Sequence, residues 1–387
     1  MQTDEFSSNP VTLPTYHLES DPSYQLWLRF SPDGKWLSCW GYSGHPTDIW
    51  NTENRQKFSL PAEERQWRVA FSPGNERLAA GGPNFVSVFE WPSARLLRRI
   101  PWRQPHEDIT EWRLEFTGPN ELLRLNSRQL WLWNTDTGAE LLSWEFGEDE
   151  YARNICTCGS DLIVFTTCPA QTQPEGWSDS MNRCLTAMNF RSKERTVVCG
   201  PPLCPWEIRF AHAVRRALVR TSDVMQPDKY ELWDLEKRSC CGKVSEKLHD
   251  MLLSADARYV VARREGAFVV WDTRYDRLSR SIELGGAYAP IEFSPKHLVV
   301  AGIANFVDTP LDRTLFMDVH TGACLGETSG HPMQPAALFS PCGRWFASAM
   351  SELEHSMSWQ PAPIGTVLLS DLEPILARAT PIGGAPA

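Results

Sequence analysis

A single phrase recurs along the chain: a short alternating strand ending in Phe, a Ser-Pro type of turn, and a second apolar run. Clear copies read WLRFSPDGKWLSCW at 27–40, RVAFSPGNERLAA at 68–80 and ALFSPCGRWFAS at 337–348. One blade of a β-propeller spans about 40–45 residues, so a repeat of about 44 residues predicts a ring of blades. The equivalent positions are Phe30, Phe71, Phe116, Cys156, Phe210, Leu253, Phe293 and Phe339.

Each copy continues into a third strand with an aromatic or acidic end, and most copies add a shorter apolar run as a fourth, outer strand. Apolar residues that alternate along a strand share one face, and stacked blades bury such faces. The third strands are TDIWN (47–51), SVFEW (87–91), LWLWN (130–134), LTAMNF (185–190), YELWDL (230–235), FVVWDT (268–273), LFMDV (315–319) and VLLSDL (367–372). Eight third strands match eight first strands, which favours eight blades.

Seven blades remain an alternative, because the fourth copy, ICTCGSDLIVF at 155–165, matches the phrase poorly. Closure of the ring is a separate requirement, since an open edge strand invites aggregation. The residues after Asp371 are too rich in Pro and Gly for an outer strand, so we expect Val11–Leu18 to complete the last blade. The predicted organisation is a flexible segment 1–10, a propeller over 11–376 and a flexible tail 377–387.

The motifs resemble those of WD-repeat propellers over roughly residues 11–376. Trp233-Asp234 and Trp271-Asp272 match the family's Trp-Asp dipeptide, and Trp50-Asn51 and Trp133-Asn134 are near matches. The turn SPDG at 31–34 is similar to the family's first hairpin. This resemblance implies an all-β propeller that binds proteins.

The chain also departs from the family pattern. The Gly-His pair before the first strand is matched only by Gly330-His331. The buried Asp between the second and third strands is replaced by residues such as Asn84, Asn126 and Glu265. We therefore expect a divergent member that is held together chiefly by apolar and Trp packing.

Composition restricts the function further. A formal net charge of -10 argues against binding of a nucleic-acid backbone, which requires an excess of Lys and Arg. The polar N-terminus and the lack of an 18-residue apolar run predict a cytoplasmic protein without a membrane segment. The 11 cysteines are irregularly spaced, which predicts reduced thiols and no metal site.

Tryptophans precede several first strands at matching offsets, as in Trp67-Arg68, Trp112-Arg113 and Trp206-Glu207, with Trp27 one place later. In the resembled family this segment enters from the rim near the central channel, where partners dock. Because Trp and Arg are common interface anchors, we predict a protein-binding site here. Alternatively, these tryptophans cap the core between adjacent blades.

A long insertion at 166–183 carries an isolated Trp177, and shorter interruptions occur at Val307–Arg313 and Met350–Pro363. All three lie between second and third strands, so they should emerge on one face and could form a composite binding surface. The alternative is that they are tolerated surface excursions.

The predicted function is a non-catalytic scaffold, monomeric in itself, that binds protein partners within a larger complex through the propeller rim and the fourth-blade insertion. The sequence contains no haem-attachment motif, phosphate-binding glycine loop or nucleophile elbow, so we expect no cofactor and no catalysis. The alternative is a propeller enzyme or cofactor-binding protein that uses the central channel.

Overall fold

The computed structural model describes residues 11–382 with gaps. The gaps are 24–25, 42–46, 61–67, 83, 103–112, 148–149, 159–160, 170–183, 200–203, 212–213, 224–225, 245–247, 265–266, 275–276, 284–287, 305–312, 330–331 and 351–363.

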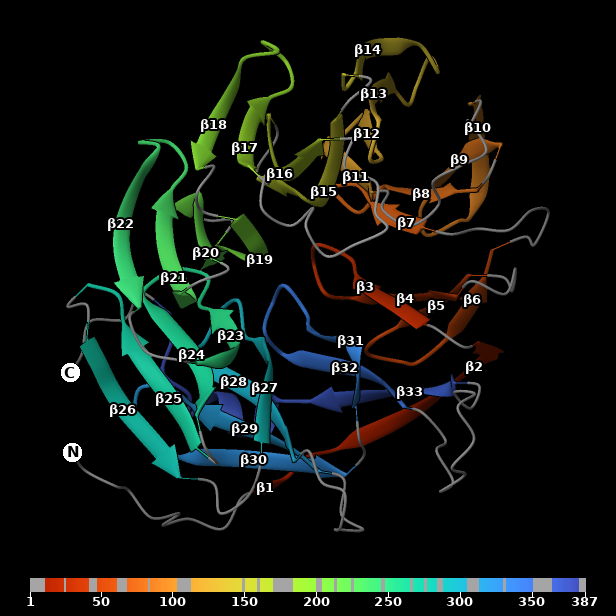
Figure 1. The fold of residues 1–387 in the computed structure, drawn as a ribbon. Helices are drawn as coiled ribbons and strands as arrows, with labels where there is room; N and C mark the ends of the chain where they lie inside the picture. Colours follow the sequence, from red (N-terminus) through yellow and green to blue (C-terminus); the bar gives the residue numbers. More distant parts are fainter. Residues whose placement is uncertain are drawn as a thin grey trace, which may run out of the picture.

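Eight sheets of antiparallel strands are arranged radially around a common centre (Figure 1). From the innermost strand outward, blade one comprises β3 (Leu26–Phe30), β4 (Trp36–Gly41), β5 (Asp48–Asn51) and β6 (Lys57–Ser59), and blade two comprises β7 (Arg68–Phe71), β8 (Arg77–Gly81), β9 (Phe85–Glu90) and β10 (Arg95–Pro101). Blade three comprises β11 (Arg113–Gly118), β12 (Glu121–Leu125), β13 (Gln129–Asn134) and β14 (Glu140–Glu145). Blade four comprises β15 (Glu150–Cys158), β16 (Leu162–Pro169), β17 (Cys184–Asn189) and β18 (Arg195–Cys199).

The remaining blades follow the same order. Blade five comprises β19 (Cys204–Ala211), β20 (Arg216–Asp223), β21 (Gln226–Asp234) and β22 (Ser239–Val244), and blade six comprises β23 (His249–Leu253), β24 (Tyr259–Arg264), β25 (Ala267–Asp272) and β26 (Arg277–Glu283). Blade seven comprises β27 (Tyr288–Phe293), β28 (Val299–Ala304), β29 (Arg313–Asp318) and β30 (Cys324–Ser329). Blade eight comprises β31 (Pro332–Phe339), β32 (Trp345–Met350), β33 (Ile364–Asp371) and β2 (Thr15–Ser23).

The predicted fold is confirmed, with eight blades rather than seven. Every marker position falls in the first strand of a blade, including Cys156 in β15 of the weakly matching fourth copy. Neighbouring first strands contact one another around the centre, as β7 does with β11 and β23 with β27. The third strands are almost continuously buried, and all six residues of β25 are buried.

The hydrophobic core is divided among the spaces between adjacent blades. One cluster joins Trp40 and Ile49 of blade one to Val69 and Phe71 of blade two. Another joins Leu37 of blade one to blade eight. Because each blade needs both neighbours to bury its faces, the ring is stable only when it is closed.

Closure takes place as predicted, through the N-terminal segment. Strand β2 pairs antiparallel with β33, with Tyr16 opposite Leu369 and Leu18 opposite Val367. A second contact was not predicted: β1 (Val11–Thr12) adds a parallel strand to the outer edge of β30 in blade seven. The N-terminal segment therefore links the last two blades.

The lower face, as we define it, is the end of the blades that carries the turns between first and second strands and between third and fourth strands. In four blades, the Ser after the marker position accepts a hydrogen bond from the amide that opens the second strand, at 2.9–3.0 Å. These serines are Ser31, Ser72, Ser254 and Ser340. The Ser-Pro type of turn in the sequence thus has a direct physical role.

The Asp or Asn that ends most third strands caps the following turn, because its side-chain oxygen accepts backbone amides two or three residues further on. Asn134 accepts the amides of Asp136 and Thr137, and Asp234 accepts those of Glu236 and Lys237. Asn51, Asn189, Asp272, Asp318 and Asp371 make equivalent bonds.

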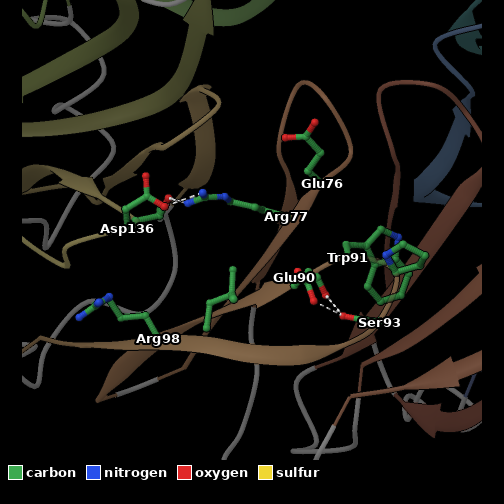
Figure 2. A pocket seen from close by; sticks show the side chains of 10 residues that line it. Glu76, Arg77, Glu90, Trp91, Ser93, Arg98 and Asp136 are labelled. Carbon is green, nitrogen blue, oxygen red and sulfur yellow. Dashed lines mark hydrogen bonds and ion pairs between the residues drawn. The ribbon is translucent and has the colours of Figure 1, made fainter.

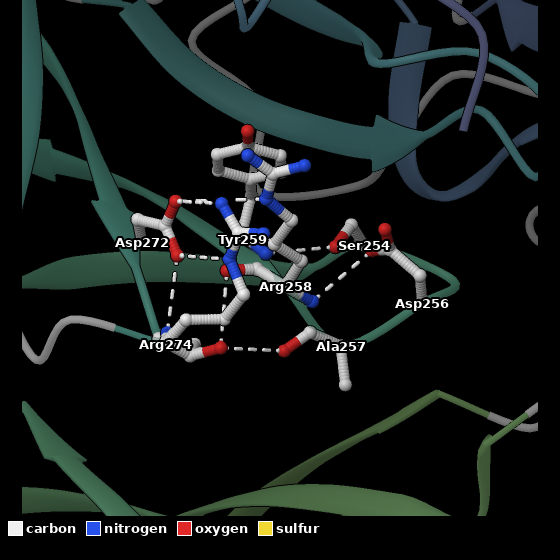
Figure 3. Close-up of polar contacts among 8 residues, drawn as sticks. Ser254, Asp256, Ala257, Arg258, Tyr259, Asp272 and Arg274 are labelled. Atoms are coloured by element: carbon white, nitrogen blue, oxygen red, sulfur yellow. Dashed lines mark hydrogen bonds and ion pairs between the residues drawn. The ribbon is translucent and has the colours of Figure 1, made fainter. Parts of the chain in front are cut away.

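Figure 3 shows both turn types in blade six. Asp272 accepts the amide of Arg274 at 3.0 Å, and its carboxylate also forms an ion pair with Arg258 at 3.5 Å. Ser254 accepts the amide of Tyr259 at 2.9 Å. The last residue of the Trp-Asp dipeptide therefore ties the two lower-face turns of its blade together.

The chain after β33 continues along the lower face of blade seven. Helix α1 (Glu373–Leu376) buries Ile375 beside Leu13. Further on, the amide of Thr380 donates to Asp318 at 2.6 Å, and the amide of Leu298 donates to the Thr380 carbonyl at 2.6 Å. The boundaries 1–10 and 377–387 stay predictions, since residues 1–10 and 383–387 lie outside the described part of the chain.

We expect Leu18→Ala to destabilise the propeller by about 2–4 kcal/mol, because Leu18 is buried between blades eight and one. His17→Ala, at an exposed position of the same strand, should change the free energy of unfolding by less than about 0.5 kcal/mol. Urea unfolding followed by tryptophan fluorescence measures both variants. Equal effects of the two substitutions would show that β2 does not close the ring.

Candidate functional site

The upper face is the opposite end of the blades, where first strands begin and where the chain passes from second to third strands. Two of the predicted site residues, Trp27 and Arg68, lie together there. The guanidinium carbon of Arg68 in β7 lies 5.2 Å from the centroid of the Trp27 ring in β3. A cation over the face of an indole is attracted by the ring quadrupole, so this contact joins blades one and two.

Trp27 is half-buried. Its ring packs against the interblade cluster that contains Trp40 and Val69, and in the sheet it lies opposite Trp40. Part of the Trp27 side chain therefore fills the core, and part of it remains accessible beside Arg68. Both of the roles considered for it, core packing and binding, are compatible with this geometry.

The other predicted residues are placed less completely. Arg113 is exposed at the start of β11, opposite Leu125. Trp206 belongs to β19, but its side chain lies outside the described residues, as do Trp67, Trp112 and Trp177.

The three interruptions of the repeat leave and re-enter the sheets on the upper face. The first runs from the end of β16 to the start of β17, the second from β28 to β29, and the third from β32 to β33. Most of each interruption lies outside the described residues. Their end points nevertheless lie on the same face as Trp27 and Arg68.

A buried arginine near the upper face was missed by the sequence reasoning. Arg124 of β12 is fully buried, and its guanidinium lies over the ring of Trp102 and 4.9 Å from the centroid of Trp131. Burial lowers the pKa of Arg124 well below its usual value. The only signal in the sequence was a single Arg inside the apolar run ELLRL.

Charged side chains from several first strands line the centre of the ring. Arg29 donates to the carbonyls of Val69 and Leu114, at 3.3 and 2.9 Å, and lies 3.7 Å from the carboxylate of Glu115. These bonds connect blades one, two and three. Polar contacts therefore join these blades at the centre of the ring.

A second pair of charges lies on the other side of the centre. Arg209 donates to the carbonyl of Met251 at 3.1 Å, which links blades five and six. Burial raises the pKa of Glu292 in β27 to about 7, although the amide of Phe293 and the charge of Arg209 both favour its ionised form. Glu292 is thus a partly buried residue whose carboxyl titrates near neutral pH.

Within the described ranges, no group of three or more His, Cys, Asp or Glu side chains is arranged to hold a metal ion. Burial raises the pKa of the Cys199 thiol to about 12 and that of Cys324 to about 11, so both are protonated at neutral pH. No helix in the described part of the chain is long and apolar enough to cross a membrane.

Comparison with known proteins gives a likeness in fold. No family model and no curated protein matches the chain. Among solved structures, the C-terminal WD40 domain of Sif2 is 11% identical, with 94% of this chain and 99% of that chain covered and a TM-score of 0.58. The RRP9 WD40 repeats are 13% identical, with 94% and 99% covered and a TM-score of 0.55.

A third similar structure is the dihydro-heme d1 dehydrogenase NirN in complex with DHE, 13% identical, with 85% of this chain and 75% of that chain covered and a TM-score of 0.55. At such identities the likeness establishes the fold alone. The chain is an eight-bladed β-propeller, similar in fold to these WD40 domains, and its sequence matches no family model. Since one neighbour is an enzyme by its name, the fold does not distinguish binding from catalysis.

The pKa of Glu292 generates a pH prediction. The native state holds a proton that the unfolded chain, with a pKa near 4.5, releases. The contribution of Glu292 to stability should therefore be greatest below pH 4.5 and should fall, by up to about 3 kcal/mol, as the pH rises to about 7. Glu292→Gln removes this loss. The free energy of unfolding of the variant, relative to that of the wild type, should therefore increase as the pH rises from 4.5 to 7.

Urea unfolding between pH 4 and pH 8 measures this difference. Glu140→Gln, at an exposed position of β14, controls for the loss of one carboxylate. Parallel stability curves for Glu292→Gln and the wild type would show that the Glu292 carboxyl has an ordinary pKa.

A double-mutant cycle of Trp27→Leu and Arg68→Met should give a coupling energy of about 0.5–2 kcal/mol, because each variant removes one partner of the cation–π contact. Thermal unfolding of the four proteins provides the measurement. Strictly additive effects would mean that the guanidinium gains nothing from the indole.

Proposed function

We propose that this propeller is a non-catalytic protein-binding scaffold that holds partners on its upper face within a larger assembly. The observation that carries the proposal is the pairing of Trp27 with Arg68 across blades one and two. An aromatic ring and a guanidinium held by two packed blades lose little conformational freedom on binding, and these two residue types dominate interface energies.

The surroundings of this pair support the same proposal. The three interruptions of the repeat begin and end on the same face of the propeller as the Trp27–Arg68 pair. A rigid scaffold that carries variable connections on one face is a common arrangement for recognition. Trp67, Trp112, Trp206, Arg113 and Trp177 are further proposed anchors of this surface.

The net charge indicates which partners the scaffold suits. At -10, the protein attracts basic surfaces over distances of about a Debye length and repels acidic ones. We propose a protein partner that approaches with a basic surface, and no nucleic acid. The alternative use of the central channel for catalysis has no specific observation in its favour among the described residues.

The test is affinity purification of the tagged protein from its native source, with quantitative mass spectrometry of the partners. Trp67→Ala, Trp112→Ala and Trp206→Ala should each reduce partner recovery at least fivefold while the melting temperature stays within about 3 °C of the wild type, because a large interface anchor is lost. Val197→Ala, on the exposed outer strand β18, is the matched control and should leave recovery unchanged.

Deletion of residues 170–180 provides a second arm, with reduced recovery expected at a nearly unchanged melting temperature. If the tryptophan variants unfold instead, these residues belong to the core. If all variants fold and capture the same partners as the wild type, the upper face is not the binding surface.

A further inference from the structure

A pocket of about 640 Å³ opens on the lower face, between blades two and three and away from the proposed scaffold surface (Figure 2). Its walls come from the two lower-face turns of blade two, from outer strand β10, and from the turn that follows β13 in blade three. The side chains that matter for the argument are Glu76, Arg77, Trp91, Leu97, Arg98 and Asp136.

Two arginines of blade two extend toward the turn of blade three. Arg77 donates to the hydroxyl of Thr135 at 2.6 Å and to the carboxylate of Asp136 at 2.5 Å. Arg98 runs along the same turn, so closely that a Cβ atom on Gly138 would lie 2.9 Å from its Cδ. Figure 2 shows Arg77, Arg98 and Asp136 on one side of the pocket.

The two guanidinium groups differ in their partners. Arg77 is paired, but Asp136 has 47% of its side chain exposed, so another carboxylate can replace it at small cost. Arg98 has neither a carboxylate nor a hydrogen-bond acceptor within bonding distance among the residues that the structure describes. One positive charge at the pocket wall is therefore uncompensated.

The opposite wall carries carboxylates of its own. Glu90 is held by Arg95 through two hydrogen bonds of 3.0 Å, and these bonds, together with one from Ser93, lower the pKa of Glu90 to about 2. The charge of Glu90 is therefore already paired with Arg95. Glu76 also lines that side and is exposed, so the positive charge of the pocket is confined to the wall formed by Arg77 and Arg98.

The pocket also has an apolar portion on a firm base. Leu97 lines the pocket, and the adjacent Leu96 is 43% exposed on β10. Trp91 is almost fully buried, and its ring packs edge-on against Trp36 and Phe71, with centroids 5.0 and 6.1 Å away. A ligand here meets a preformed surface rather than a mobile one.

We propose that this pocket docks an acidic segment of a partner protein. One carboxylate of the segment pairs with Arg98 and shares Arg77 with Asp136, while a neighbouring apolar side chain packs on Leu97. A planar guanidinium can donate two parallel hydrogen bonds to one carboxylate, whereas the compact ammonium group of a lysine cannot. The protein as a whole has a net charge of -10 and attracts basic surfaces, whereas this pocket binds an acidic segment.

The test starts from selection of a displayed library of random synthetic peptides on the full-length protein. Selected peptides should be enriched in Asp and Glu next to an apolar residue. Fluorescence anisotropy then measures the affinity of the most enriched peptide for each variant. We expect Arg98→Glu to weaken binding at least tenfold, whereas Arg99→Glu, the same charge change at the next residue, should change it less than twofold.

Two further measurements make the outcome decisive. Asp136→Asn leaves Arg77 without its ion-pair partner and should strengthen peptide binding about threefold. Trp27→Leu, on the upper face, should leave it unchanged, which separates this site from the proposed scaffold surface. Thermal unfolding confirms that each variant is folded. The proposal is overturned if acidic peptides are not enriched, if Arg98→Glu and Arg99→Glu weaken binding equally, or if Asp136→Asn weakens it.

Discussion

One backbone hydrogen bond recurs in all eight blades, and the rest of the structure depends on it. The amide that follows the third strand donates to the carbonyl that precedes the second strand, at 2.7–3.0 Å. The donors are Thr52, Trp91, Thr135, Phe190, Leu235, Thr273, Val319 and Leu372. Because both groups belong to the backbone, the bond sets the strand register and the position of the lower-face turns without requiring a particular side chain. A fold that is fixed by such backbone bonds tolerates wide variation in side chains.

Side chains reinforce this register where the sequence allows. Ser31 and its equivalents shape the first turn, and Asp or Asn caps the second, as Asp272 does in blade six. These contacts are local, with partners only a few residues away or across one blade. For that reason the repeat and the eight third strands could be predicted from the sequence, whereas the closing N-terminal strand was predicted from the need to close the ring. The aromatic and acidic ends of the third strands carried the necessary information.

Other features depend on contacts between distant segments and could not be predicted. The addition of β1 to β30 requires a close approach, since a Cβ atom at Gly326 would lie 2.9 Å from the carbonyl oxygen of Val11. The same limit applies to the sites. Trp27 and Arg68 were both predicted as site residues, but their contact across two blades appears only in the structure. By contrast, Arg77 and Asp136 are 59 residues apart and meet only because blades two and three are adjacent.

The central claim is that the two ends of the chain meet in a closed ring of eight equivalent blades. Hydrogen–deuterium exchange at increasing urea concentrations tests it most directly. In a closed ring, the amides of residues 15–18 and of Leu372 are protected to the same degree as those of Thr135 and Thr273 in interior blades, and they lose protection at the same urea concentration. Early exchange of residues 15–18 and 366–372, while interior blades remain protected, would contradict a closed ring.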